Sequence, residues 1–174
     1  TTLQNFAEKD NEGIDLDLQA RFAKLPIGDL ALRNSTTYYI RQQRKNDSAG
    51  EWEEFNATYA APRWRNMSSV TLDSGPWQGA MAVRWTGGFY DTDEPDPEIG
   101  VERKVRSHRE FDVLGSYTGF KNMKIDLGIR NLFNRMPPFS FQNAVSNQYS
   151  QMGFAELYST RGRFFYTTLA YQFK

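Results

Sequence analysis

Apolar and polar residues alternate along most of this chain, and this period of two limits the possible fold more than any other feature. From Ile14 to Phe22 every second residue is apolar. A helix would scatter these side chains around its circumference, whereas a β-strand places them on one face. The alternation returns in six further segments, and no segment shows a helical period. The sequence therefore predicts an all-β protein with about seven strands, at residues 14–22, 30–41, 64–72, 77–86, 111–117, 123–130 and 165–173.

The connections between the predicted strands alternate in length. Short connections with turn-forming residues span 23–29, 73–76 and 119–122. Long polar connections span 42–61, 91–109 and 134–162. Antiparallel strands joined in this way form an up-and-down meander with two unlike ends. Outer-membrane β-barrels have this asymmetry, with short periplasmic turns and long extracellular loops.

Aromatic residues lie at both ends of the apolar face. If the short turns are periplasmic, the periplasmic end carries Phe22, Trp77, Tyr117, Tyr171 and Phe173, and the other end carries Tyr38, Trp64, Trp85, Phe111 and Phe165. The positions between them are mainly aliphatic or small. Two aromatic girdles around an aliphatic band are typical of a membrane barrel whose apolar face meets lipid. We therefore predict that this face, with its girdles, faces lipid.

The charged residues of the predicted strands lie on the opposite face. They are Asp15, Asp17, Arg33, Arg84, Asp112, Lys124, Asp126 and Arg130. An Arg or Lys that faces lipid at the bilayer midplane costs about 2–4 kcal/mol, so this segregation suits a membrane. Asn34, on an apolar face, and Leu114 and Phe164, on polar faces, break the pattern. The alternative is a soluble antiparallel barrel or sandwich with the apolar face inward, which does not explain the paired girdles.

Composition excludes several classes of protein. The 21 Lys and Arg balance the 21 Asp and Glu, so no basic excess is present to neutralise nucleic acid. The mean hydropathy is −0.68, and no apolar run is long enough for a membrane-spanning helix. The chain has no Cys, and its single His108 has no partner motif, so we predict no metal and no cofactor. A barrel enzyme would also need a nucleophile or activated water beside a positioned base, so we predict no enzymatic activity.

Seven strands leave two open edges. In hydrocarbon each unpaired backbone group costs several kcal/mol, and single-chain bacterial barrels use even strand numbers. One interpretation is that residues 1–11 supply an eighth strand and make a small self-contained barrel with a structural or adhesive role. The other is that the edges pair with another polypeptide. Because residues 8–12 continue into the first strand without a turn, we predict that they extend it and that the chain belongs to a larger barrel.

Several segments resemble the TonB-dependent outer-membrane receptors. The segment Arg161–Phe173 resembles the last strand of that family, and Gly128–Pro138 resembles its penultimate strand with an Asn-Leu-Phe exit. Weaker similarities lie at Gly13–Asp17, Ala61–Arg63 and Arg84–Asp91. They follow the order of the family along nearly the whole chain.

This resemblance implies an antiparallel transmembrane barrel of about 22 strands around a plug domain. Residues 1–174 would form about the last third of the barrel, with the plug absent from this chain. The implied location is the bacterial outer membrane, in contact with lipid and lipopolysaccharide. The implied partners are the rest of the barrel, the plug and, through the plug, TonB. The implied function is uptake of a scarce nutrient such as a ferric siderophore.

Candidate ligand-binding residues then lie in the long loops and the upper lumen. Aromatic and amide groups suit planar, sugar-like or siderophore-type ligands through stacking and hydrogen bonds. The predicted set is Tyr90, Phe139, Phe141, Gln142, Asn143 and Tyr149 in the loops, with Arg63 and Arg84 on the lumen face. Two alternatives stay open: the loop rings pack onto their neighbours, and the arginines pair with Asp15, Asp17 or Asp126 instead of attracting an anionic chelate.

Overall fold

A computed structural model describes residues 8–45, 50–59, 61–91, 103–140 and 157–173. The strands are β1 (Glu8–Leu25), β2 (Gly28–Lys45), β3 (Glu53–Glu54), β4 (Trp64–Ser74), β5 (Trp77–Thr86), β6 (Phe89–Tyr90), β7 (Lys104–Val105), β8 (His108–Tyr117), β9 (Met123–Arg130) and β10 (Phe164–Tyr171). No helix in this part of the chain could cross a bilayer.

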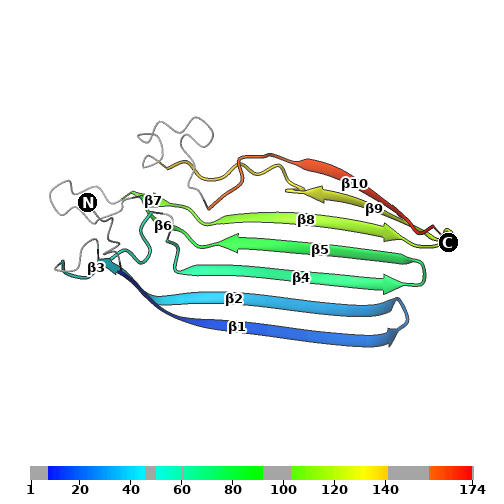
Figure 1. Ribbon diagram of the computed structural model, residues 1–174, viewed down its shortest axis with the longest axis horizontal. Helices are drawn as coiled ribbons and strands as arrows, with labels where there is room; N and C mark the ends of the chain where they lie inside the picture. The colour runs from blue at the N-terminus through cyan, green and yellow to red at the C-terminus, as the bar shows by residue number, and fades with distance from the viewer. Residues whose placement is uncertain (1–7, 46–49, 60, 92–102, 141–156, 174) are drawn as a thin grey trace, which may run out of the picture.

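The seven long strands form one antiparallel sheet in the order β1-β2-β4-β5-β8-β9-β10 (Figure 1). Each long strand therefore pairs with the next long strand along the chain. The short strand β3 pairs with the end of β2, and β6 pairs with β7 in a separate two-stranded ribbon. The predicted all-β, up-and-down meander is confirmed.

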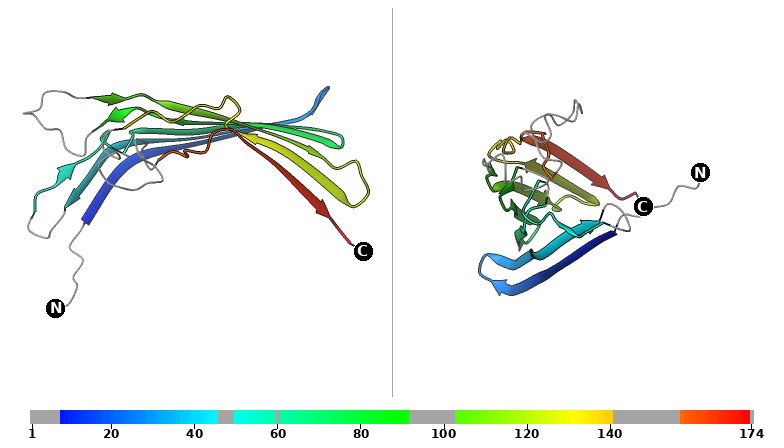
Figure 2. Two further views of the ribbon diagram at one scale, coloured as in Figure 1. Left: turned by 90° about the horizontal axis from the view of Figure 1, so that it is seen from above. Right: turned by 90° about the vertical axis from the view of Figure 1, so that its left-hand side faces the viewer.

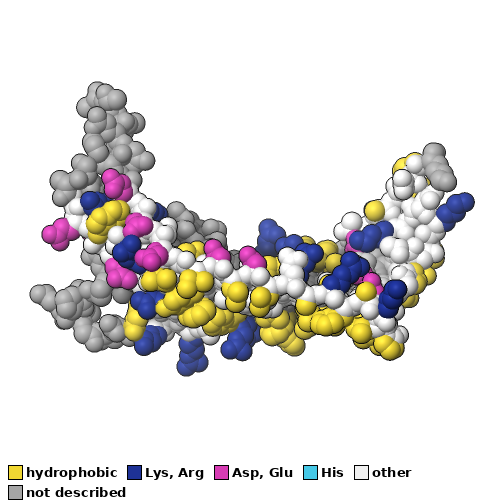
Figure 3. All heavy atoms as spheres, turned by 90° about the horizontal axis from the view of Figure 1, so that it is seen from below, with side chains coloured by type: hydrophobic (Ala, Val, Ile, Leu, Met, Phe, Trp, Pro, Cys, Tyr) yellow, Lys and Arg dark blue, Asp and Glu magenta, His cyan; other side chains and the backbone are white. Residues whose placement is uncertain are grey.

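The sheet is bowed like part of a barrel wall. Figure 2 shows the strands following an arch, and Figure 3 shows hydrophobic side chains gathered along the outer side of that arch. The aliphatic residues that alternate in the sequence stay exposed on this convex face: Leu16 is 50% exposed, Leu127 60% and Leu169 64%. The apolar face therefore does not close over a dry interior, which argues against the soluble alternative.

Aromatic side chains meet across strands at both ends of the convex face. Trp77 lies opposite Tyr117 in the register, and their ring centroids are 4.4 Å apart. At the other end Tyr38 lies opposite Trp64, also at 4.4 Å. Because side chains that face each other across a strand pair share one face, the register gives each end of the predicted face a cross-strand aromatic pair.

The first two strands are longer than predicted. Ion pairs join Arg41 to Asp10 at 3.2 Å and to Glu12 at 3.3 Å, and the Gln43 amide donates to Asp10 at 3.0 Å. These polar pairs continue the ladder where the alternation of apolar residues has ended. The expectation that residues 8–12 extend the first strand is confirmed, and the expectation that a loop begins at Gln42 is wrong because β2 runs to Lys45.

Two of the residues that broke the alternation lie on the concave face. Leu114 lies opposite the small residues Ala80 and Gly128 in the register. Phe164 stacks on Tyr166 with centroids 6.4 Å apart. A Cβ added at Gly128 would lie 2.1 Å from the Tyr166 ring, so the glycine leaves room for that ring to lie across the strand. Leu114 and Phe164 therefore project from the face opposite the exposed aliphatic residues.

Candidate functional site

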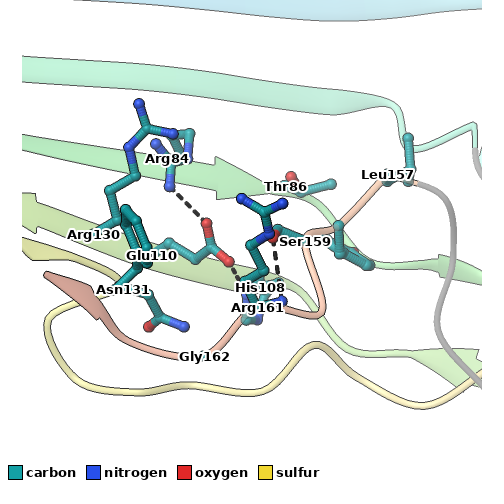
Figure 4. Close-up of a pocket in the computed structure, with 12 residues that line it drawn as sticks. Arg84, Thr86, His108, Glu110, Arg130, Asn131, Leu157, Ser159, Arg161 and Gly162 are labelled. Carbon is teal, nitrogen blue, oxygen red and sulfur yellow. Dashed lines mark hydrogen bonds and ion pairs between the residues drawn. The ribbon is translucent and has the colours of Figure 1, made fainter. Parts of the chain in front are cut away.

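A cavity of about 400 Å³ lies on the concave face at the upper ends of β5, β8, β9 and β10 (Figure 4). It is lined by Arg84, Thr86, His108, Glu110, Arg130, Asn131, Leu157, Tyr158, Ser159, Arg161, Gly162 and Phe164. The strands bring their polar faces to it because alternation puts charged residues on this side of the sheet. The segment after residue 156 supplies the remaining wall.

Arg84 is held by two carboxylates from the neighbouring strand. It lies opposite Glu110 in the register and bonds that carboxylate at 2.7 Å and Asp112 at 2.5 Å. The other oxygen of Glu110 lies 3.3 Å from Nε2 of His108, and Figure 4 shows the three side chains joined in a row. The Arg84 charge is therefore largely balanced inside the wall.

The predicted partners of Arg84 were wrong. Asp126 instead accepts from Ser116 and pairs with Lys124 at 3.1 Å, and Asp15 accepts from Thr37 at 2.6 Å. These carboxylates belong to β9 and β1, whereas Arg84 lies on β5, whose neighbour is β8. The order of strands in the sheet decides which carboxylate pairs with Arg84, and the alternation of apolar residues does not reveal which strands are adjacent.

Two further arginines make the cavity electropositive. Neither Arg130 nor Arg161 contacts a carboxylate within ion-pair distance among the residues that the structure describes. The Arg130 guanidinium lies 5.8 Å from the centroid of the Tyr166 ring, which leaves its N–H groups open to another partner. Three arginines and one glutamate line the cavity, so its lining carries an excess of positive charge.

The Asn-Leu-Phe segment fixes the floor of the cavity. Asn131 has a φ of 50°, a left-handed conformation that asparagine adopts more readily than most residues. Its side chain accepts the N–H of Arg135 and donates to the Arg135 carbonyl, both at 2.8 Å. Its own N–H donates to Asp112 at 2.9 Å, and Asn134 accepts the N–H of Arg163 at 2.8 Å. These bonds tie the end of β9 to β8 and to the start of β10.

Tyr158 lines the cavity, but its hydroxyl is buried. Its side chain is 6% exposed, packs with Phe89 and Val105, and meets the His108 ring edge-on at 5.1 Å. Its hydroxyl has no hydrogen-bond partner in the described part of the chain. Burial raises the pKa of Tyr158 to about 12, with Arg65 acting in the opposite sense, so the phenol is neutral and can donate. An unmade hydrogen bond on a buried group costs about 1–3 kcal/mol, and this hydroxyl has almost no accessible surface through which a ligand could remove that cost.

Two of the predicted loop residues, Tyr90 and Phe139, each pack against a basic side chain outside this cavity. Arg103 pairs with Asp91 at 2.7 Å, donates to the Phe139 carbonyl at 3.1 Å and lies 5.6 Å from the centre of the Phe139 ring. Lys104 lies 4.9 Å from the centre of the Tyr90 ring. These contacts fit the packing interpretation, although Phe139 remains 45% exposed.

The other predicted residues are divided. Arg84 lines the cavity. Arg63 does not line it: this residue precedes β4, is exposed, and its carbonyl accepts the N–H of Tyr39 at 2.9 Å. Phe141, Gln142, Asn143 and Tyr149 lie outside the described residues.

Sequence reasoning missed Arg130, Arg161, Tyr158 and the Glu110–His108 pair as members of one site. The sequence did carry one indication of this site, namely the positions of its charged residues along the predicted strands. Arg84, Glu110 and Arg130 each stand on the polar face near the upper end of a predicted strand. Once strands of neighbouring sequence are paired, these positions converge. The loop tyrosine gave no comparable signal.

The chain is similar to known proteins in sequence pattern and in fold. Residues 1–132 match the family described as TonB dependent receptor-like, beta-barrel. No curated protein is significantly similar to the chain in sequence.

Two solved structures resemble the fold. A mutant of the ferric enterobactin receptor PfeA from Pseudomonas aeruginosa matches with a TM-score of 0.60 and 22% identity, over 94% of this chain and 22% of that chain. The copper transporter OprC matches with a TM-score of 0.50 and 14% identity, over 97% of this chain and 29% of that chain. The chain thus spans less than a third of either protein, and at these identities the likeness shows a shared fold.

Proposed function

The chain belongs to the TonB-dependent receptor β-barrel family, and from that premise we propose that it forms part of the barrel wall of a receptor that imports an anionic ferric chelate. The family is a non-enzymatic transporter family whose barrels are integral to the bacterial outer membrane. The convex face of this sheet, with its aromatic girdles, is then the surface in contact with lipid and lipopolysaccharide. The concave face lines the lumen.

The open edges of the sheet support a larger receptor. In the described part of the chain, β1 and β10 each have one long neighbour and a free edge. Free edges are not tolerated in hydrocarbon, so further strands must pair with them. We place this chain in the C-terminal third of the barrel, with the plug, and TonB through the plug, as partners supplied by the rest of the receptor. A small self-contained barrel would instead need β1 and β10 to close the wall.

The cationic cavity is the observation that carries the choice of ligand. Arg130 and Arg161 offer donors that have no carboxylate partner among the described residues. Hydrogen bonds from such donors to ionised oxygen are stronger than neutral ones, and the positive field attracts anions. A bare divalent metal cation would be repelled by the same arginines. The lining therefore favours a ferric chelate with anionic oxygens.

Removing the two arginines that have no described carboxylate partner should weaken binding of such a chelate. We expect Arg130→Gln with Arg161→Gln to raise the Kd for ferric enterobactin, used as a radiolabelled probe on outer membranes, about tenfold, which is about 1.4 kcal/mol. Arg33→Gln is the matched control because Arg33 is a lumen arginine of β2 that does not line the cavity. An unchanged Kd in the double variant, or loss of cupric-ion uptake instead, would refute an anionic ligand at this cavity.

The Tyr158 phenol gives a second test of the cavity, through a substitution that removes a single oxygen atom. We expect Tyr158→Phe to leave the receptor as stable as before, or slightly more stable, because it deletes a buried hydroxyl that makes no hydrogen bond among the described residues. The Kd for ferric enterobactin should stay unchanged, since the buried hydroxyl is not exposed to the cavity. Thermal unfolding and probe binding on the same preparation separate the two effects. A loss of stability would contradict an unsatisfied hydroxyl, and weaker binding would contradict a hydroxyl that is buried away from the cavity.

A further inference from the structure

Four polar side chains form a patch among apolar and aromatic neighbours on the convex face. Asn34 and Thr36 of β2 lie opposite Ser68 and Asn66 of β4 in the register. Positions around them on the same face are apolar or aromatic: Leu16, Leu18, Leu32, Tyr38, Trp64, Val70, Val83 and Trp85. The residue that broke the alternation in β2 is therefore one member of a group, which we call the polar ring.

The polar ring is closed by four hydrogen bonds. The Asn34 amide donates to Ser68 at 2.8 Å, and the Ser68 hydroxyl donates to Asn66 at 2.9 Å. The Asn66 amide donates to Thr36 at 2.6 Å, and the Thr36 hydroxyl donates to Asn34 at 2.9 Å. Each side chain thus donates once and accepts once within the ring. The ring holds the two strands' side chains in one fixed arrangement.

The polar ring lies in the upper half of the apolar band. Along β2, Asn34 is midway between Leu30, near the periplasmic turn, and Tyr38, in the upper aromatic pair. Four residues of strand span about 13 Å, so Asn34 and Ser68 are about that far along their own strands from this aromatic pair. Thr36 and Asn66 are half as far, and Asn66 lies opposite the girdle residue Trp85. Asn34 and Ser68 therefore lie within the apolar band, and Thr36 and Asn66 lie toward its upper border. Acyl chains, which neither donate nor accept hydrogen bonds, would be the default neighbours.

The polar ring does not use all of its hydrogen-bonding capacity. An amide has two N–H donors and an oxygen with two lone pairs. Within the ring each of the two asparagines uses one donor and one lone pair. One N–H and one lone pair remain on each amide, so the spare donors and spare acceptors are equal in number. A surface with this balance is complementary to a second copy of itself.

We propose that this wall is the contact surface between two copies of the receptor, with the polar ring of each copy bonded to that of the other. A two-fold axis along the membrane normal keeps every residue at its own depth, so ring meets ring at the same level. Amide and hydroxyl side chains join membrane-embedded segments in this way. The proposal depends on the membrane orientation of the convex face and is independent of the transported ligand.

The surface beside the polar ring suits such a contact. A groove of about 560 Å³ runs from the ring along the convex face, and its apolar lining includes Leu18, Leu32, Val70, Met81 and Val83. The neighbouring strand β1 presents exposed side chains, with Ile14 58% and Leu16 50% exposed. In a two-fold contact, such protruding side chains of one copy pack into the groove of the other. In the proposed contact, the groove supplies shape complementarity and the polar ring supplies hydrogen bonds that fix the alignment of the two copies.

Cysteine cross-linking in outer membranes tests the contact. The chain has no cysteine, so Leu32→Cys places a single thiol in this chain beside the ring, at a position that is 38% exposed. Leu127→Cys is the control because it lies on the same convex face but on β9, away from β2 and β4. With a short bismaleimide and the complete receptor otherwise free of cysteine, we expect at least fivefold more product of doubled mass for Leu32→Cys.

Removing the polar ring should abolish that product. We expect Asn34→Leu with Asn66→Leu, in the Leu32→Cys receptor, to lower its yield at least fivefold while heat-modifiability stays unchanged. Native mass spectrometry of the unmodified receptor in detergent, which needs no variant, should show two copies per particle. A single copy, equal yields from the two cysteine positions, a product with a different protein, or a yield that survives loss of the ring would overturn the proposal.

Discussion

Replacing Leu127 by arginine should cost the receptor about 2–4 kcal/mol of free energy of unfolding in a bilayer, the penalty for a basic side chain at the midplane. Leu127 stands in the middle of β9 and is 60% exposed on the convex face. Its register partners on that face are Gly115 and Thr167, which are small and leave the side chain to the surroundings. The cost therefore comes from the solvent that this side chain meets, because few packing contacts are lost.

The residues beside Leu127 provide matched controls. Thr168 and Asp126 face each other on the concave side one residue away, so Thr168→Arg puts the same side chain beside a carboxylate and water. We expect Thr168→Arg and Asp126→Asn to change the free energy of unfolding by less than about 0.5 kcal/mol. Urea unfolding in phospholipid vesicles, followed by heat-modifiability, measures all three. Equal losses for Leu127→Arg and Thr168→Arg would contradict the assignment of the two faces.

The alternation of apolar residues predicted the fold well wherever one strand face meets a uniform environment. The strand ends were less predictable. Where Arg41 pairs with Asp10 and Glu12, both faces of β1 and β2 are polar, so the period that reveals a strand disappears although the ladder continues. The short strands β6 and β7 carry no alternation at all. They form because Phe89 and Val105 bury each other with Tyr158, a contact that depends on residues far apart in sequence.

The candidate site was less predictable than the fold. Arg84 was identified from its position on the polar face, but its partners were wrong because they depend on which strand is adjacent. Arg130 and Arg161 lie 31 residues apart in sequence, and the long connection between β9 and β10 separates them. Tyr158 lies in that connection, where neither a period nor a motif fixes its position. Their meeting at one cavity is a property of the sheet and could not be obtained from any single segment.

Replacing Gly28 by alanine should lower the free energy of unfolding by about 3 kcal/mol or more. Gly28 begins β2 after the turn from β1, and its φ is +123°, a region that L side chains rarely adopt. Strain of this kind costs about 1–3 kcal/mol. An added Cβ would also lie 2.1 Å from the carbonyl oxygen of Asp73 in β4. Because the obstacle is backbone, it yields only if β2 and β4 separate beside the pair Asp29–Asp73, which sacrifices ladder hydrogen bonds worth about 0.5–1.5 kcal/mol each.

Two other glycines separate the effect of backbone strain from the effect of the steric clash at Gly28. Gly75 also has a positive φ, +57°, but a Cβ there would meet nothing within 4 Å, so Gly75→Ala should cost only the left-handed strain of about 1–2 kcal/mol. Gly79 has neither a positive φ nor a neighbour within 4 Å, so Gly79→Ala should be neutral or slightly stabilising. The same vesicle unfolding assay ranks the three. If Gly28→Ala were no worse than Gly75→Ala, the close approach of the first turn to β4 would not exist in the folded receptor, and the register that joins the first hairpin to the rest of the wall would be wrong.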